Sequence, residues 1–240
     1  MKILALESSA VAASVAVTED EKLLGMAFQN SGLTHSRTLM PIAEDLLKNM
    51  ELALSGIDLI AVAAGPGSFT GLRIGVSAAK GLAWAGEKPC CAVSTLEAMA
   101  WSVAHMGGQL CPVMDARRKQ IYNGRFEVVD GVPIRIREDR ATSLEALCDE
   151  IIAEGKKTQI LVGDGAGLCY NRFQEQGLPA LLPPPHLCLQ NAWGVARAAL
   201  EMVRQGKTVP AAQLVPEYHR LSQAERERLN KEKRSNDHGE

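Results

Sequence analysis

The chain has 240 residues, of which 46% are hydrophobic and 22% are charged, so it can bury a proper core as one large domain or as two lobes. Its 26 lysines and arginines against 28 aspartates and glutamates give a formal net charge of −2, which excludes a global basic signature for nucleic acid. The six cysteines form no Cys-x-x-C pair and no segment has the pattern of a signal peptide or a membrane span, so we expect a cytoplasmic protein without a structural zinc site and without a membrane partner.

The first half of the chain is predicted to alternate strands and helices. Strands are expected at 2–6, 13–18, 23–29, 59–64 and 90–93, and helices at 34–49, 68–85 and 94–104. The first strand ends in an acid, Glu7. The fourth strand runs into the turn Gly65-Pro66-Gly67, and Ser68 after this turn is the expected N-cap of the long helix.

The second half repeats this order. Strands are expected at 109–114, 120–129, near 134–136 and at 159–162, and helices at 143–153, 166–173 and 192–205. The first of these strands again ends in an acid, Asp115, and the last again runs into a glycine-rich turn, 163–167. Strand meanders that alternate with helices predict mixed sheets flanked by helices.

The duplicated plan predicts an α/β protein of two lobes, each a mixed sheet flanked by helices. It is the plan of the actin-like (ASKHA, ribonuclease H-like) fold. We expect an N-terminal lobe at 1–105, a C-terminal lobe at 106–221, and a charged, disordered tail at 222–240. Function does not follow from such a fold by itself.

The helix at 68–85 carries a row of small residues. Gly71, Gly75, Ala79 and Ala83 stand four apart and therefore lie along one face. Glycine inside a helix costs about 1 kcal/mol relative to alanine, so such a row usually has a packing reason. We expect another backbone, from this chain or from a partner, to lie tightly against it.

Two familiar motifs are excluded around this turn. No Gly-Lys-Ser/Thr ends the run, so it is not a phosphate-binding Walker loop. Ser68 directly follows a glycine instead of standing between two glycines in the Gly-x-Ser-x-Gly frame, so it is not the serine of a nucleophile elbow.

In the actin-like fold, nucleotide phosphates lie between two hairpins that follow the two acids, and glycine lets backbone amides face them. The turns at 8–10 and 116–119 contain no glycine. Strong ATP hydrolysis by this chain alone is therefore not expected. The weak candidates for nucleotide binding are Glu7, Asp115, Gly163 and Gly165.

Taken in order along nearly the whole chain, six blocks resemble the TsaB (YeaZ) family. These blocks are Glu7-Ser8-Ser9, Thr34-His35-Ser36-Arg37, Gly65-Pro66-Gly67-Ser68-Phe69-Thr70-Gly71-Leu72-Arg73-Ile74-Gly75, Val93-Ser94-Thr95-Leu96, Asp115-Ala116-Arg117 and Pro216-Glu217-Tyr218-His219-Arg220. The resemblance implies a paralogue of TsaD, the catalytic protein that holds a metal with a His-x-x-x-His pair. Thr95 and Met99 stand at those two places here, so no metal site and no catalytic residue are expected.

The resemblance implies a non-catalytic accessory subunit of the complex that forms N6-threonylcarbamoyladenosine at position 37 of tRNAs reading ANN codons. It implies a heterodimer with TsaD, docking of the ATPase TsaE, and tRNA reached through the complex. It implies no tightly bound cofactor, and it leaves open ATP or ADP at the interface and a homodimer when the chain is alone.

In that family the helices that correspond to 34–49 and 68–85 pack against TsaD. The expected partner-binding residues are His35, Leu39, Met40, Ala43, Gly71, Arg73, Gly75, Val76 and Ala79. The segment 216–220 is expected to fold back against a lobe and to bury the ring of Tyr218, and direct contact with tRNA is the less favoured interpretation.

A protein that is catalytic in its own right remains the alternative: a weak actin-like ATPase or kinase, or a peptidase. The hairpins without glycine speak against the first, and the lack of a nucleophile constellation speaks against the second.

Overall fold

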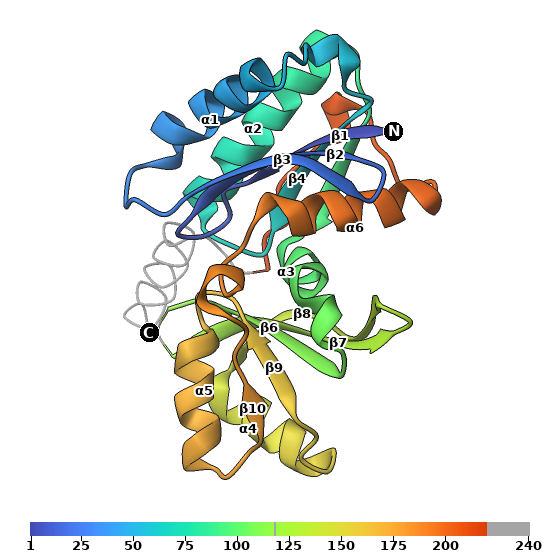
Figure 1. Cartoon of the computed structure of the whole chain (residues 1–240). Coiled ribbons are helices and arrows are strands. Elements are labelled where there is room, and N and C mark those ends of the chain that lie inside the picture. The colour runs from blue at the N-terminus through green and yellow to red at the C-terminus, as the bar shows by residue number, and fades with distance from the viewer. Residues whose placement is uncertain (118, 220–240) are drawn as a thin grey trace, which may run out of the picture.

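The computed structural model describes residues 1–117 and 119–219, which form two lobes stacked one on the other (Figure 1). Each lobe is built on a mixed sheet of five strands with helices against it. The predicted α/β class and the predicted duplication are both confirmed, because the two sheets repeat one strand order.

The first sheet has the order β3-β2-β1-β4-β5. Its strands are β1 (Lys2–Glu7), β2 (Ala13–Glu19), β3 (Lys22–Gln29), β4 (Leu59–Gly65) and β5 (Cys90–Ser94). The central strand β1 is antiparallel to β2 and parallel to β4, so that Leu4 lies opposite both Val17 and Ile60. One face of the sheet packs against α1 (His35–Asn49) and α2 (Phe69–Gly86).

The second sheet has the equivalent order β8-β7-β6-β9-β10. Its strands are β6 (Gln109–Asp115), β7 (Gln120–Val129), β8 (Val132–Ser143), β9 (Gln159–Val162) and β10 (Ala180–Leu181). One face of this sheet packs against α4 (Leu144–Ala153) and α5 (Ala166–Glu175). Two details differ from the sequence prediction: β8 is much longer than the expected strand near 134–136, and the short edge strand β10 was not expected.

Two helices are exchanged between the halves of the chain. The helix α3 (Thr95–Val103) follows the first sheet, yet Leu96, Met99 and Val103 pack in the core of the second sheet. The helix α6 (Ala192–Arg204) follows the second sheet, yet it covers the open face of the first sheet, against Ile3, Ala61 and Val93 among others. Residues 192–204 therefore pack on the first lobe, although they lie within the range 106–221 expected for the second.

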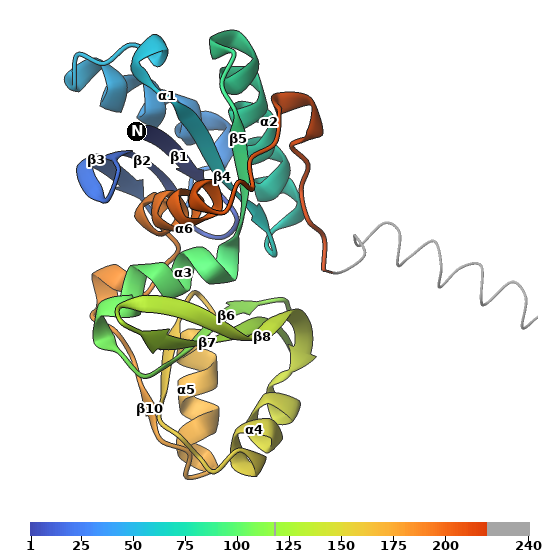
Figure 2. The ribbon, with the colours of Figure 1, turned by 90° about the vertical axis from the view of Figure 1, so that its right-hand side faces the viewer.

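The two exchanged helices cross at close range between the sheets (Figure 2). A Cβ on Gly194 of α6 would overlap the carbonyl oxygen of Ala98 of α3 and would lie 2.5 Å from Ser102 Oγ. Beside the crossing, the guanidinium of Arg197 lies 4.8 Å from the ring centre of Trp101. Glycine at position 194 is thus required for the two lobes to approach each other as they do.

The chain after α6 returns along the first lobe. Val209 pairs with Cys90 at the edge of β5, Leu214 is buried in the core under α2, and the Glu217 N–H donates to Ala64 O at 2.7 Å. The expectation that 216–219 folds back against a lobe is confirmed. The predicted tail 222–240 lies outside the described residues. Within the described ranges, no helix combines the length and the apolar character needed to cross a membrane.

Candidate functional site

The loop between β1 and β2 is sealed against the start of α2. The Ser68 N–H donates to Ser9 O at 2.7 Å, and Ser8 Oγ donates to Gly71 O at 2.9 Å. A Cβ on Gly67 would lie 2.5 Å from Ser9 O. The turn Gly65-Pro66-Gly67 therefore brings backbone close to backbone of this same chain. Ser68 caps α2 as predicted, since its hydroxyl accepts from the Gly71 N–H at 3.4 Å.

The small-residue row of α2 faces into the lobe. A Cβ on Gly71 would overlap Ser8 O, and one on Gly75 would overlap Ser8 Oγ and lie 3.3 Å from Val62 Cγ2. Ala79 and Ala83 are buried in the core under the first sheet. The close approach that the row predicted exists, but the neighbour is this chain's own loop and strand β4.

In this orientation most of the expected partner-binding residues are buried within the lobe. These residues are Leu39, Ala43, Gly71, Gly75, Val76 and Ala79. His35 is half-buried, with Nε2 at 2.6 Å from Ala10 O. Only Met40 and Arg73 of the expected set are exposed.

A different row of α2 faces solvent. Ser77 and Gly81 are exposed and stand four apart, and Trp84 further along is 72% exposed. Apart from the nearby backbone of its own helix, no described atom lies within 4 Å of the place where a Cβ on Gly81 would stand. This row was not predicted from the sequence. Comparing all faces of α2 would have shown a second small-residue row, flanked by a tryptophan.

Glu7, the first nucleotide candidate, is completely buried at the end of β1. Its Oε1 accepts from the Ser9 N–H at 2.5 Å, and no described residue gives Oε2 a hydrogen bond. Burial raises the pKa of Glu7 to about 7, and the nearby Asp164 charge adds to the rise. Ser8 and Ser9 are fully buried too, so this loop presents no open cradle for a phosphate.

The other nucleotide candidates also have packing roles. A Cβ on Gly163, whose φ is +114°, would overlap Val113 O, and one on Gly165 would lie 2.9 Å from Val113 Cγ1. Both glycines thus let the turn before α5 press against the end of β6. Asp115 is exposed and its Oδ1 accepts from the Arg117 N–H at 2.7 Å, which orders the turn between β6 and β7.

Thr95 and Met99 lie in the interior at the start of α3, with 0% and 1% of their surfaces exposed. Met99 packs in the core of the second sheet, and its sulfur faces Gly163. A hydroxyl and a thioether in such a place do not match the donor set of a hard or borderline metal ion.

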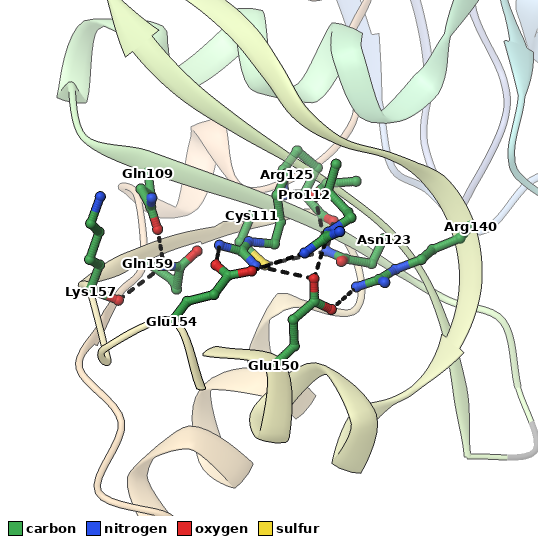
Figure 3. A network of polar contacts seen from close by, with 12 residues as sticks. Gln109, Cys111, Pro112, Asn123, Arg125, Arg140, Glu150, Glu154, Lys157 and Gln159 are labelled. Carbon is green, nitrogen blue, oxygen red and sulfur yellow. Dashed lines mark hydrogen bonds and ion pairs between the residues drawn. The ribbon is translucent and has the colours of Figure 1, made fainter. Parts of the chain in front are cut away.

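The polar cluster drawn in Figure 3 joins β7 and β8 to α4. Arg125, almost fully buried, is ion-paired with Glu154 and lies 3.4 Å from Glu150 Oε1, and Glu150 in turn lies 2.6 Å from Arg137 Nε. The neighbouring Cys111 thiol is buried, and this burial raises its pKa to about 12. The thiol therefore stays protonated and unreactive. The ion pairs of the cluster hold α4 against β7 and β8.

The first turns of α2 carry a compact stack of three side chains. The rings of Phe69 and Tyr218 lie 4.8 Å apart at 28°. The Arg73 guanidinium lies 3.9 Å from the centre of the Phe69 ring, and its Nε–H donates to Tyr218 Oη at 2.9 Å. The expectation that Tyr218 buries its ring is wrong, because 41% of this residue is exposed.

Comparison with known proteins gives consistent matches over most of the chain. The family model for TsaD, tRNA N6-adenosine threonylcarbamoyltransferase, matches residues 17–227. The tRNA threonylcarbamoyladenosine biosynthesis protein TsaB of Bacillus subtilis is 31% identical over 236 residues, which cover 97% of this chain and all of that protein. YeaZ from Pseudomonas aeruginosa superposes with a TM-score of 0.76 at 28% identity, over 90% of this chain and 99% of that chain.

A more distant neighbour supports the fold alone. The activator of 2-hydroxyisocaproyl-CoA dehydratase from Clostridium difficile, solved with bound ADPNP, superposes with a TM-score of 0.51 at 10% identity, over 86% of this chain and 97% of that chain. The architecture is thus the duplicated actin-like fold that the sequence predicted. From the match to the TsaD model and the identity to curated relatives over their full length, the chain belongs to the TsaB (YeaZ) family of tRNA threonylcarbamoyladenosine biosynthesis proteins.

Proposed function

We propose that the chain is the non-catalytic subunit of a threonylcarbamoyl transferase complex that modifies adenosine 37 of tRNAs reading ANN codons. It pairs with TsaD, which performs the transfer, and the pair recruits the ATPase TsaE in the cytoplasm. ATP or ADP binds at the interface of the pair.

One observation supports this proposal: the chain matches the TsaD family model, but the residues that stand at the places of the metal-binding histidine pair are part of its own core. The β1–β2 loop is bonded to α2 through Ser9 O and Ser8 Oγ, and Thr95 and Met99 belong to the core. One outer face of α2 remains exposed to solvent. We assign the partner face to the exposed row of α2, Ser77, Gly81 and Trp84, where small residues allow close approach of a helix and the indole supplies an anchor.

Reconstitution tests the role of the subunit. TsaD, TsaE, ATP, threonylcarbamoyl adenylate and tRNA are combined with and without this chain, and modified adenosine is measured by mass spectrometry. The expected result is a large loss of modification when the chain is omitted. Modification at the full rate without it contradicts the proposal, and turnover of ATP by the chain alone supports the catalytic alternative.

The partner face is tested with Gly81→Leu. The new side chain enters open space in the monomer, so the chain folds normally and gains up to about 1 kcal/mol of helix propensity. In the complex it enters the helix contact, and we expect TsaD to bind about tenfold more weakly or worse, as measured by calorimetry.

The matched control is Gly167→Leu on α5, where a Cβ also meets open space, but on the other lobe. This variant is expected to bind TsaD normally. If both variants bind TsaD as tightly as the native chain does, the outer row of α2 is not part of the interface. If both bind TsaD equally weakly, the effect of the leucine at position 81 is not local.

A further inference from the structure

Three arginines stand apart from the others in having no acidic partner among residues 1–117 and 119–219. These are Arg37, Arg73 and Arg117, all exposed. Every other described arginine is ion-paired: Arg125, Arg135, Arg137, Arg140, Arg172, Arg197 and Arg204. An unpaired guanidinium keeps its fork of N–H donors available for an anion.

The three arginines belong to elements of both lobes that lie on one side of the molecule (Figure 1). Arg37 lies in the first turn of α1, and Arg73 lies near the start of α2. The starts of these helices are joined through the β1–β2 loop, since His35 contacts Ala10 O and the Ser68 N–H donates to Ser9 O. Figure 1 shows both helix starts and the β6–β7 turn on the same side of the molecule, at the left of the view.

The β6–β7 turn of the second lobe lies near the end of β1. Burial is the main cause that raises the pKa of Asp164, the charge of Asp115 in the turn adds to this rise, and Asp164 in turn acts on Glu7 at the end of β1. Arg117 and Lys119 of the turn both have φ of +61°, a conformation that costs less with glycine or asparagine.

An aromatic surface lies beside Arg73. Tyr218 is half-exposed and rests on Phe69, with Arg73 bonded to its hydroxyl. Only Nε of the Arg73 guanidinium is engaged in a hydrogen bond within the described chain, so its terminal nitrogens remain free. Proteins that bind unpaired RNA combine these parts: arginines for phosphates, and aromatic or arginine planes on which bases stack.

Among the described residues, the nearby carboxylates form no ion pair with these three arginines. Asp115 accepts from the Arg117 backbone N–H, Asp164 accepts from Gln190 Nε2 at 2.9 Å, and Glu217 lies 3.4 Å from His219. A protein partner would have to bring its own carboxylates to each arginine. A phosphate backbone supplies anions along its whole length, which favours RNA as the occupant.

We propose that Arg37, Arg73, Arg117 and the Phe69–Tyr218 stack, together the arginine rim, bind tRNA directly, with phosphates on the guanidinium groups and one unpaired base on Tyr218. This inference rests on the proposed function, because a tRNA-modifying complex is where such a surface has a substrate. It adds to that function a contact made by the non-catalytic subunit itself.

The test is tRNA binding by the chain assembled with TsaD, followed by fluorescence anisotropy of a labelled tRNA transcript at several salt concentrations. The variant R37Q/R73Q/R117Q is expected to bind about tenfold more weakly or worse. The slope of log K against log salt should become shallower by about 0.9 for each phosphate that an arginine no longer neutralises. The control K22Q/K48Q/K207Q removes the same charge from exposed lysines that have no ion pair among the described residues, and it should change binding by about twofold at most.

Stacking is tested separately with Tyr218→Ala and Tyr218→Phe. The alanine variant loses the ring and should bind tRNA about tenfold more weakly, whereas the phenylalanine variant keeps the ring and should bind nearly as the native chain does. Melting temperatures identify any variant that fails to fold.

Complex assembly, measured by size-exclusion chromatography, separates the two proposals. Normal assembly with unchanged tRNA affinity and salt slope overturns the arginine rim and leaves the proposed function intact. Loss of TsaD binding in the arginine variant assigns the rim to a protein partner instead, which also overturns the inference. Failure of the native chain to assemble with TsaD contradicts the proposed function.

Discussion

Glu7 is an acid at the end of a strand whose carboxyl group lies in the interior of the lobe. Its carboxyl group lies at the end of β1, where the actin-like plan has the first acid, but the β1–β2 loop encloses it completely. The loop itself is bonded to α2. The carboxyl group has become part of the interior and is held largely in its neutral form at pH values below 7.

The buried state of Glu7 predicts a pH-dependent stability. The pKa is about 7 in the folded chain and near 4.5 when unfolded, so the folded state binds more protons between these values. The free energy of unfolding therefore falls as the pH rises from 4.5 to 7, by about 3 kcal/mol from this group, and stays level above pH 7. Glu7→Gln cannot ionise and lacks this decline.

Urea unfolding of both proteins at pH 5, 6, 7 and 8 measures the effect. The stability of Glu7→Gln relative to the native chain should increase steadily up to pH 7, whatever the fixed cost of the amide. A constant difference across the series would show that Glu7 is ionised in the folded chain.

The helix α2 shows what a helical element can hide when only its sequence is known. In the sequence, the row of Gly71 and Gly75 and the row of Gly81 are both made of small residues. In the structure, the first row contacts Ser8 and Val62, whereas Gly81 faces open space among the described residues. The row that was expected to face a partner, Gly71 to Ala79, packs inside the lobe of this chain. A row of small residues predicts that another backbone lies close, but it does not tell whether that backbone belongs to the same chain or to a partner.

Gly75→Leu and Gly81→Leu form a matched pair on this helix. Both replace glycine by leucine and so gain about the same helix propensity. At position 75 the side chain meets Ser8 Oγ and Val62, and overpacking should cost about 1–3 kcal/mol or more, whereas position 81 is open.

Thermal unfolding of the isolated chain should therefore give a clearly lower melting temperature for Gly75→Leu than for Gly81→Leu. Similar melting temperatures would mean that the β1–β2 loop can move away from α2, and that the seal over Glu7 is weak.

Most elements were predictable because their sequences agree with one periodicity. Strands such as β1 and β4 are short apolar runs that end in an acid or in glycine, and α2 begins at a serine cap. The length of β8 was hidden because charged residues interrupt its apolar pattern. Arg135 pairs with Glu97 of α3, and Arg137 and Arg140 pair with Glu150 of α4. The edge strand β10 has two residues beside a proline, and it exists only because β9 offers an open edge.

At the scale of the whole molecule, the exchange of α3 and α6 was not predictable. Both helices are apolar enough to cover either sheet, and the choice depends on how the chain crosses between the lobes. The candidate site was predictable only in part. The sequence blocks that indicate the family could be read directly, whereas the packing of the β1–β2 loop against α2 and the positions of the unpaired arginines depend on contacts between distant segments.

The α3–α6 crossing predicts a sensitive position between the lobes. Gly194→Ala places a methyl group on the carbonyl oxygen of Ala98, so the helices must separate. We expect a net loss of about 1–3 kcal/mol in the free energy of unfolding, despite the gain in helix propensity.

The control is Gly167→Ala, where the added methyl group meets open space and the free energy should stay level or rise by up to about 1 kcal/mol. Chemical denaturation followed by tryptophan fluorescence measures both, since Trp101 and Trp193 lie beside the crossing. Equal stability of the two variants would show that α3 and α6 can move apart freely.

The exchange of helices also bears on how the protein is made. On the ribosome, the first sheet emerges early, but one of its faces stays uncovered until α6, ending at Arg204, has been synthesised. The strands β1 and β4 are apolar on that face, so a nascent chain exposes a ready site for chaperones during most of its synthesis. A message that stops before the codon for residue 192 therefore yields a first lobe with half of its core open to water, and not a smaller folded protein.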